Sequence, residues 1–196
     1  MIVARIARLL ATGLAAITVA SCSASAPARF YTLDSKATAD GQSPATYGVV
    51  IGAVSVPAVV DRPQLVVQVA PNRVEIDEFN RWAAPLAESI AEAVAANLSV
   101  LLGTPNVATA QRESFAPAYR VTLDVQRFES APGEGVTIEA VWAVSRAGGD
   151  HSRAGRTTAH ENVQAKSIDA LVAAHSLALT QLSKDIAAAI RAENKR

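Results

Sequence analysis

Two neighbouring segments in which apolar and polar residues alternate set the strongest constraint on the fold. In residues 119–128 every second position is apolar as far as Val125, and residues 136–145 repeat this alternation. A period of two places successive side chains on opposite faces of a β-strand. The turn sequence Ala-Pro-Gly-Glu-Gly over residues 131–135 separates the two segments. We therefore expect two antiparallel strands with one face buried and the other exposed to water.

Two longer segments have the three- and four-residue spacing of apolar positions that is typical of an amphipathic helix. The first begins after Trp82, with Pro85 in its first turn, and ends at Gly103; its apolar positions are Leu86, Ile90, Val94, Leu98, Leu101 and Leu102. The second lies near the C-terminus; its apolar face comprises Ile168, Val172, His175, Leu179, Leu182, Ile186 and Ile190. Each segment can therefore cover one side of a sheet.

Shorter segments rich in β-branched and aromatic residues predict the remaining strands. They span residues 30–33, 47–56, 65–69, 74–78, 107–110 and 153–163. Strands precede each helix, which predicts the α+β class: a mostly antiparallel sheet with two amphipathic helices packed on one face. The length of 196 residues fits a single domain, which we place at residues 30–196.

The first 21 residues have the layout of a secretory signal peptide. Arg5 and Arg8 give a positive start, residues 9–20 are apolar, and small residues follow. The apolar stretch is shorter than the ~20 residues that a membrane-spanning helix needs. We assign residues 1–21 to the signal peptide and leave them out of the fold argument.

Cys22 is the only cysteine of the chain, and it follows Val19-Ala20-Ser21. This sequence resembles the bacterial lipobox, in which an apolar residue and two small residues precede a cysteine whose thiol forms a thioether to diacylglycerol. The alternative is an ordinary signal peptide that ends near a cysteine. We expect a covalent lipid on Cys22, a tether over residues 22–29, and durable anchoring by two or more acyl chains. Ser23, where an Asp would favour retention at the inner membrane, points to the periplasmic face of the outer membrane.

Charge and aromatic content argue against a nucleic-acid partner. Lys and Arg together number 18, as do Asp and Glu, and aromatic residues make up only 5% of the chain. A nucleic-acid-binding protein needs a basic field or a platform of aromatic side chains on which bases stack. We therefore expect no nucleic-acid partner.

The chain has three histidines, and none of them stands in a catalytic or metal-binding motif. His175 falls on the apolar face of the last helix, which predicts a core position, while His151 and His160 are too far apart for a common zinc spacing. We expect no enzyme activity, no metal and no cofactor other than the lipid on Cys22. The alternative is a periplasmic hydrolase with an unrecognised site around His151 or His160.

Several segments together resemble a known family. They are residues 30–33 (FYTL), residues 54–66 (VSVPAVVDRPQLV), residues 81–86 (RWAAPL) and residues 97–103 (NLSVLLG). In this order they are similar to the ABC-type transport auxiliary lipoproteins, and among these to the PqiC-like (YmbA-like) branch. The most distinctive residues are Pro57, Asp61-Arg62-Pro63-Gln64 and Arg81-Trp82.

The resemblance implies a role in the cell envelope. It implies a lipoprotein on the periplasmic face of the outer membrane, serving an MCE-protein system that moves lipids between the two membranes, with the chain as docking or receiving element. A homo-oligomer is compatible with this role. The alternative is a structural or assembly lipoprotein of another envelope complex.

Four residues are candidates for contact with such a partner: Asp61, Arg62, Arg81 and Trp82. Each has a structural alternative. Asp61 and Arg62 can belong to a simple turn before Pro63, and Arg81 and Trp82 can close the start of the first helix over the core.

We predict that Cys22→Ala leaves the fold intact but abolishes lipid-dependent maturation and membrane anchoring, because no other side chain can form the thioether. Cell fractionation and the sensitivity of precursor processing to globomycin measure this. Unchanged fractionation of the variant, or processing that globomycin does not inhibit, would count against the lipobox.

Overall fold

In the computed structural model, the residues that the structure describes (27–110, 115–149 and 152–195) form eight strands and two helices. Signal peptide residues 1–21, Cys22 and His151 lie outside the described residues. The elements are β1 (Arg29–Tyr31), β2 (Val49–Ser55), β3 (Gln64–Ala70), β4 (Arg73–Trp82), α2 (Leu86–Leu102), β5 (Val107–Thr109), β6 (Tyr119–Ala131), β7 (Gly135–Arg146), β8 (Ser152–Asn162) and α3 (Ile168–Asn194).

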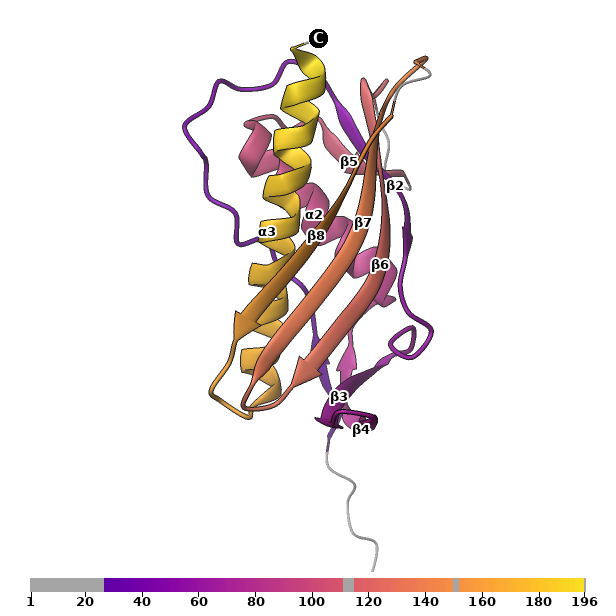
Figure 1. Ribbon diagram of the computed structural model, residues 1–196, viewed down its shortest axis with the longest axis vertical. Coiled ribbons are helices and arrows are strands. Elements are labelled where there is room, and N and C mark those ends of the chain that lie inside the picture. Colours follow the sequence, from indigo (N-terminus) through magenta and orange to yellow (C-terminus); the bar gives the residue numbers. More distant parts are fainter. Residues whose placement is uncertain (1–26, 111–114, 150–151, 196) are drawn as a thin grey trace, which may run out of the picture.

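The larger sheet has five strands in the order β5-β2-β6-β7-β8 (Figure 1). β6 and β7 pair in antiparallel fashion, as their alternating sequence predicts, and β8 pairs with β7 in the same fashion; β2 runs parallel to both β5 and β6. The α+β class is confirmed, and the sheet is mixed rather than purely antiparallel. The difference arises because α2 lies between β2 and β5 in the chain, and a helical connection returns the next strand in the same direction.

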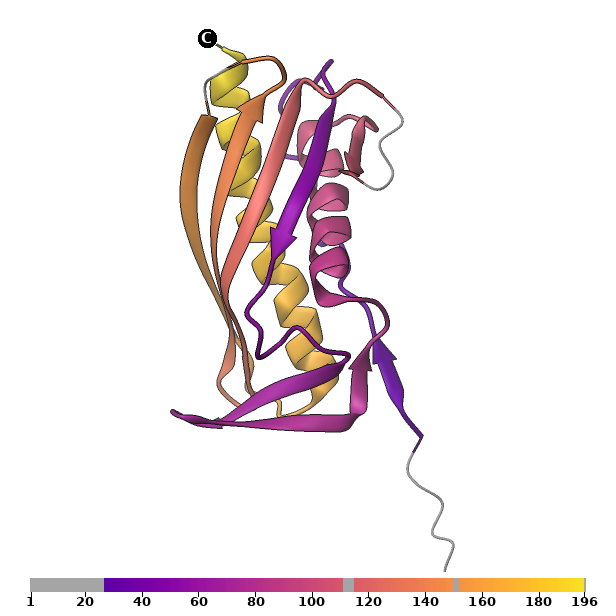
Figure 2. The same ribbon diagram turned by 90° about the vertical axis from the view of Figure 1, so that its right-hand side faces the viewer.

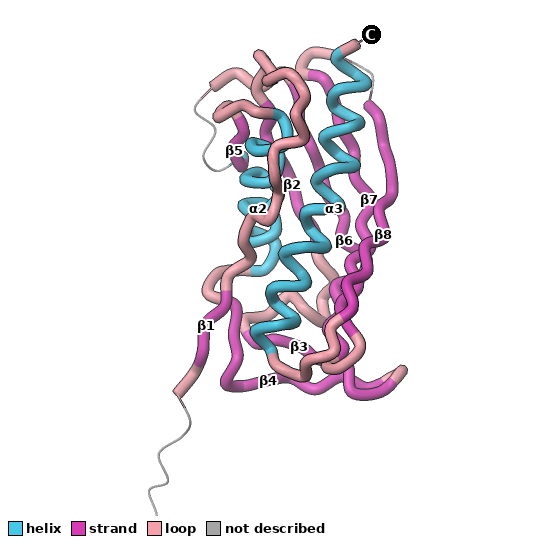
Figure 3. Tube along the Cα trace, turned by 90° about the vertical axis from the view of Figure 1, so that its left-hand side faces the viewer, coloured by secondary structure: helices cyan, strands magenta, loops and turns pink. Residues whose placement is uncertain are grey.

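Both helices cover one face of the larger sheet, as predicted (Figure 3). α2 packs against β2 and β5, α3 packs against β7 and β8, and the two helices touch each other. α2 begins after Pro85 and ends at Gly103, whose φ of 63° is the left-handed conformation that closes many helices. At the start of α3 the Ser167 side chain accepts a hydrogen bond from the backbone N–H of Ala170.

A bulge in β6 changes which residues face the helices. The register between β6 and β7 shifts between Val125 and Arg127, so Gln126 is an extra residue. The buried positions are odd-numbered up to Val125 and even-numbered from Phe128 onward. Without this bulge, Phe128 and Ser130 would face water. The sequence alternation alone does not reveal the bulge.

Trp142 on β7 lies over Gly155, its cross-strand partner on β8. A Cβ atom on Gly155 would come within 2.3 Å of Trp142 Cζ2. The indole Nε1 donates a hydrogen bond to Thr157 Oγ1 at 3.1 Å, and Thr157 Oγ1 donates to Asp185 Oδ2 of α3 at 2.5 Å. This chain of contacts ties β7 and β8 to the helix.

The long segment between β1 and β2 crosses the helices, and several of its hydrogen bonds go to the buried side chain of Asn97 of α2. Asn97 Oδ1 accepts hydrogen bonds from Ser35 Oγ at 2.7 Å, Ala37 N at 3.1 Å and Lys36 N at 3.2 Å. Thr180 Oγ1 of α3 donates to the same oxygen at 3.4 Å. One amide therefore links this segment to both helices.

β1, β3 and β4 form a separate small sheet at one end of the molecule, in the order β1-β4-β3 (Figure 2). The predicted hairpin of β3 and β4 is confirmed, but it does not join the larger sheet. Prolines 57 and 63 lie between β2 and β3, where they prevent continuous pairing and redirect the chain. The small sheet closes the end of the core through Trp82 and Leu65, which are both buried.

We predict that Gly155→Ala lowers the free energy of unfolding by about 1–3 kcal/mol, because the new methyl group overpacks the space held by Trp142. Urea unfolding followed by circular dichroism measures this. Gly149→Ala is the matched control, since the nearest atom to its Cβ would be Arg146 Cβ at 3.6 Å. Equal stability of the two variants would contradict the packing described.

Candidate docking surfaces

The structure brings the four predicted contact residues together, although about twenty positions separate the two pairs in the sequence. The backbone N–H of Trp82 donates to the carbonyl oxygen of Pro63 at 2.7 Å. Gln64 and Arg81 are cross-strand neighbours in β3 and β4. The turn that contains Asp61 and the end of β4 therefore form one continuous surface region at the small sheet.

Asp61 and Arg62 belong to a tight turn, as their sequence predicts. The N–H groups of Val60 and Asp61 both donate to the carbonyl oxygen of Pro57, at 3.0 and 3.1 Å. The Asp61 side chain is exposed. Arg62 is half-buried, and its Nε atom is buried without a hydrogen-bond partner.

Trp82 is 5% exposed, which places its ring in the core. The ring meets Phe128 of β6 edge to face, with 6.0 Å between ring centroids. Trp82 therefore closes the core where α2 begins, as its structural alternative predicts. Its backbone hydrogen bond to Pro63 positions its neighbour Arg81 beside the turn that precedes β3.

Arg81 lies at the surface and contacts Glu78 in two ways. Its Nε donates to the Glu78 carbonyl oxygen at 3.0 Å, and its Nη2 lies 3.5 Å from Glu78 Oε2. Gln64 Nε2 donates to the same carboxylate at 3.1 Å. An exposed ion pair of this kind contributes at most about 1 kcal/mol to folding, so Arg81 can be changed with little effect on the fold.

β4 bends sharply before the residues that pair with β1 (Figure 2), and Asp77 supplies the hydrogen bonds at this corner. Its Oδ1 accepts hydrogen bonds from the N–H groups of Phe79 and Asn80, each at 3.0 Å, and its Oδ2 accepts from Asn80 Nδ2 at 2.7 Å. Tyr31 of β1 donates to Asn80 Oδ1 at 3.0 Å. Sequence analysis missed this role, although an Asp that bonds backbone groups two and three residues onward is a known turn device.

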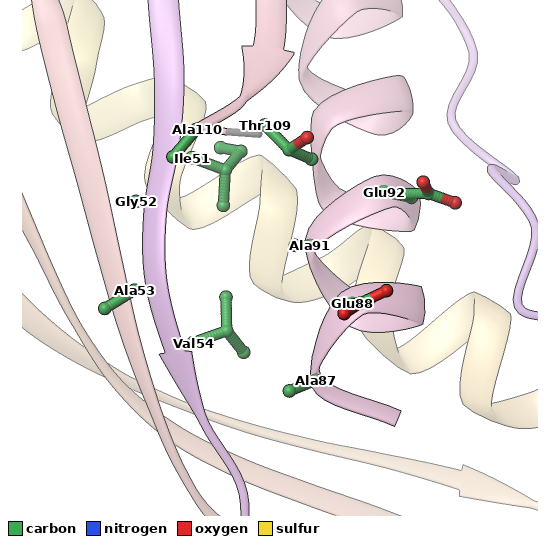
Figure 4. A pocket seen from close by; sticks show the side chains of 10 residues that line it. All are labelled: Ile51, Gly52, Ala53, Val54, Ala87, Glu88, Ala91, Glu92, Thr109 and Ala110. Carbon is green, nitrogen blue, oxygen red and sulfur yellow. The ribbon is translucent and has the colours of Figure 1, made fainter. Parts of the chain in front are cut away.

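A groove of about 350 Å³ lies between β2 and α2 (Figure 4). β5 pairs only with the start of β2, so the groove opens beside the rest of that strand. Small and apolar residues line its floor, and two carboxylates stand on the helix side; the lining includes Gly52, Ala53, Val54, Ala87, Ala91, Glu88 and Glu92.

His175 occupies the core position that the helical spacing predicts. Its ring is fully buried, stacks on Phe128 with 3.9 Å between ring centroids, and lies with Nε2 2.8 Å from Ser130 Oγ. Burial lowers the pKa of His175 from 6.5 to about 3, so the imidazole is neutral at physiological pH. The bulge in β6 supplies both neighbours.

His160 is exposed on β8, where its ring nitrogens contact Thr137 Oγ1 at 3.0 Å and Asn162 Oδ1 at 3.3 Å. These contacts join neighbouring strand residues.

Within the described ranges, no three His, Cys, Asp or Glu side chains are arranged to hold a metal ion. In the same ranges, neither helix is both long and apolar enough to cross a bilayer.

Comparisons with known proteins give a family and two similar structures. Residues 31–187 match the profile of a family described as the ABC-type transport auxiliary lipoprotein component. A crystal structure titled only as an uncharacterized protein aligns with TM-score 0.68 and 20% identity, covering 84% of this chain and 99% of the other. Protein XCC0632 from Xanthomonas campestris, of family DUF330, aligns with TM-score 0.68 and 19% identity, covering 81% and 92%. At these identities the structures show a shared fold. No curated protein matches the sequence.

We predict that the stability of the protein falls by about 2 kcal/mol more between pH 7 and pH 5 when His175 is present than when it is absent. The unfolded chain takes up a proton on this residue below its ordinary pKa of 6.5, whereas the folded chain does so only near 3. The stability that depends on neutral His175 is therefore complete above pH 6.5 and is lost as the pH falls.

Urea unfolding of the wild type and of the double variant His175→Leu/Ser130→Ala at both pH values tests this. The double change avoids leaving the buried Ser130 hydroxyl unpaired. His160→Gln, which removes an exposed histidine, is the control and should keep the wild-type dependence. Equal pH dependence in all three proteins would contradict the burial of His175.

Proposed function

Because the chain belongs to the family of ABC-type transport auxiliary lipoprotein components, we propose that it is a lipid-anchored accessory subunit of an MCE-type system for phospholipid transport between the two membranes. Membership gives the general role, an auxiliary lipoprotein of a transport system. We propose three points beyond this role: an MCE-domain partner, a phospholipid cargo, and a location on the periplasmic face of the outer membrane. In this proposal the chain docks the periplasmic transporter at the outer membrane and supports the integrity of the envelope.

The observation that carries the proposal is the short separation between Cys22 and the folded domain. β1 begins at Arg29, seven residues after Cys22. A chain extends by at most about 3.6 Å per residue, so a lipid on Cys22 would hold the start of β1 within about 25 Å of its attachment point. Such an anchor keeps the domain beside the bilayer, where a docking subunit is needed.

The proposed role is binding rather than catalysis. We assign the chain no reaction step and no cofactor beyond the covalent lipid. The core position of His175 and the strand-surface contacts of His160 are consistent with this assignment. The energy for transport and the path for lipid then belong to other subunits, and a second copy of this chain is an additional partner to test.

We propose that the partner contacts the surface around Asp61, Arg62 and Arg81. Two chain segments supply it, and the hydrogen bond from Trp82 to Pro63 fixes their relative position. A surface made from two segments on a rigid support suits recognition, because little ordering is needed when the partner binds.

Crosslinking in intact envelopes, followed by mass spectrometry, tests the partner and the location together. We expect crosslinks from this surface to an MCE-domain protein. Crosslinks only to components of another envelope assembly would contradict the proposal and favour the structural or assembly role.

We predict that Arg81→Glu reduces recovery of the partner at least severalfold in a membrane copurification while changing the melting temperature little, because Arg81 makes only surface contacts. Arg127→Glu is the matched control: Arg127 also pairs with a nearby glutamate, Glu129, but on the larger sheet. Arg62→Glu should likewise weaken recovery. Parallel losses of thermal stability and partner recovery would instead assign these residues a structural role.

A further inference from the structure

Exposed large apolar side chains concentrate on the small sheet. Of eight such side chains among the described residues, five belong to β1, β3 and β4: Phe30 (66% exposed), Val69 (38%), Val74 (48%), Ile76 (44%) and Phe79 (47%). Isolated exposed apolar residues are ordinary, but a cluster of them marks a contact surface.

The strand pairing shows that two of these residues, Val74 and Ile76, lie on the same side of the sheet. Successive side chains of a strand point to opposite faces, so Val66 of β3 lies on the face opposite Leu65, although both residues are buried. Ile76 lies opposite Val66, and Val74 lies opposite Gln68, so both share that face. The acidic Glu75 and Asp77 alternate with them and belong to the other face.

The same argument places Phe30. β1 pairs with β4 so that Tyr31 lies beside Trp82 and Phe30 beside Arg81. Trp82 is buried and Tyr31 packs against the core, which turns Phe30 and Arg81 outward. Phe79 stands at the corner of β4 that Asp77 holds. We call Phe30, Val74, Ile76 and Phe79 the apolar end patch.

The course of the chain indicates what covers the apolar end patch. β1 enters the small sheet at the end of the molecule opposite the C-terminus of α3 (Figure 2). Phe30 is only eight residues after Cys22. The attachment point can therefore lie no more than about 30 Å from Phe30, even with the tether fully extended. A bilayer that holds the acyl chains is thus within reach of the patch in every anchored molecule.

The chemistry of the patch suits the boundary between lipid headgroups and acyl chains. Phenylalanine and branched aliphatic side chains bury in that layer, and arginines at its rim can reach phosphate groups. Arg29 of β1 and Arg73 of β4 lie beside the patch, and both are exposed. Anionic lipids attract such cations near a membrane surface.

We propose that the apolar end patch rests in the interfacial layer of the same bilayer that holds the lipid on Cys22; this inference rests on the proposed anchor. Contact at both the acyl chains and the patch fixes the orientation of the domain. Its long axis points away from the membrane, and the C-terminal end of α3 faces the periplasm (Figure 2). The small sheet is then a second membrane attachment, beyond the covalent one.

The single cysteine makes a direct test feasible. Once Cys22 carries lipid, an introduced cysteine is the only free thiol available to a nitroxide label. The full, lipid-modified chain is reconstituted into vesicles of phosphatidylethanolamine and phosphatidylglycerol, with labels at Ile76→Cys or Phe79→Cys. Val100→Cys on α2 and Leu177→Cys on α3 are matched controls, because these residues are exposed to a similar extent but lie outside the small sheet.

Collision of the label with oxygen, which enters lipid, and with a water-soluble nickel chelate reports its depth. We expect the ratio of oxygen to nickel accessibility to be severalfold higher at positions 76 and 79 than at 100 and 177. Equal ratios at the four positions, with the protein still floating with the vesicles, would overturn membrane contact while leaving the anchor intact.

Two further outcomes separate the inference from the function on which it rests. Failure of the lipid-modified chain to float with vesicles would overturn both the anchor and the membrane contact. Labels at 76 and 79 that stay accessible to nickel on vesicles, but become protected when a purified MCE-domain protein is added, would overturn membrane contact and make the patch a protein-docking surface.

Discussion

Burial of the apolar faces of α2 and α3 against one face of the five-stranded sheet is the interaction on which the rest of the structure depends. It forms the hydrophobic core of the residues that the structure describes and leaves the other face of the sheet to water. It also leaves one end of the core open beside Phe128. The small sheet closes that end with Trp82, and so the β3–β4 hairpin is held where the chain arrives from Cys22.

The elements with long, regular periodicity were predictable from sequence, because their signals are local. Both helices, the alternating strands β6 and β7, and the core position of His175 follow from spacing alone. The parallel pairing of β2 was not predictable in this way, because it depends on partners far away in the chain. Neither was the bulge at Gln126, which turns Phe128 and Ser130 toward His175. Strand register is set by tertiary packing, which short-range patterns do not report.

At the candidate surface, too, the local features were predictable from sequence and the contacts between distant segments were not. The turn before Pro63 could be predicted from its residues, and its proximity to Arg81 could not, because a hydrogen bond between distant segments creates it. Trp82 proved to be a core residue. The sequence could not show this, because an aromatic residue just before a helix can either pack into the core or lie at the surface. The sequence shows that apolar and acidic residues alternate over residues 74–77. Only the pairing with β3 shows that Val74 and Ile76 lie on the face opposite Leu65. Family membership gives the general role, and these contacts suggest where the role is carried out.

The central claim is that a lipid on Cys22 holds this domain at a membrane. The most direct measurement is the mass of the N-terminal peptide of the protein purified from membranes. Our account predicts a peptide that begins at Cys22 and carries a diacylglyceryl thioether together with an acyl chain on its amino group. A mature protein whose Cys22 is unmodified, or whose N-terminus lies after Cys22, would contradict it.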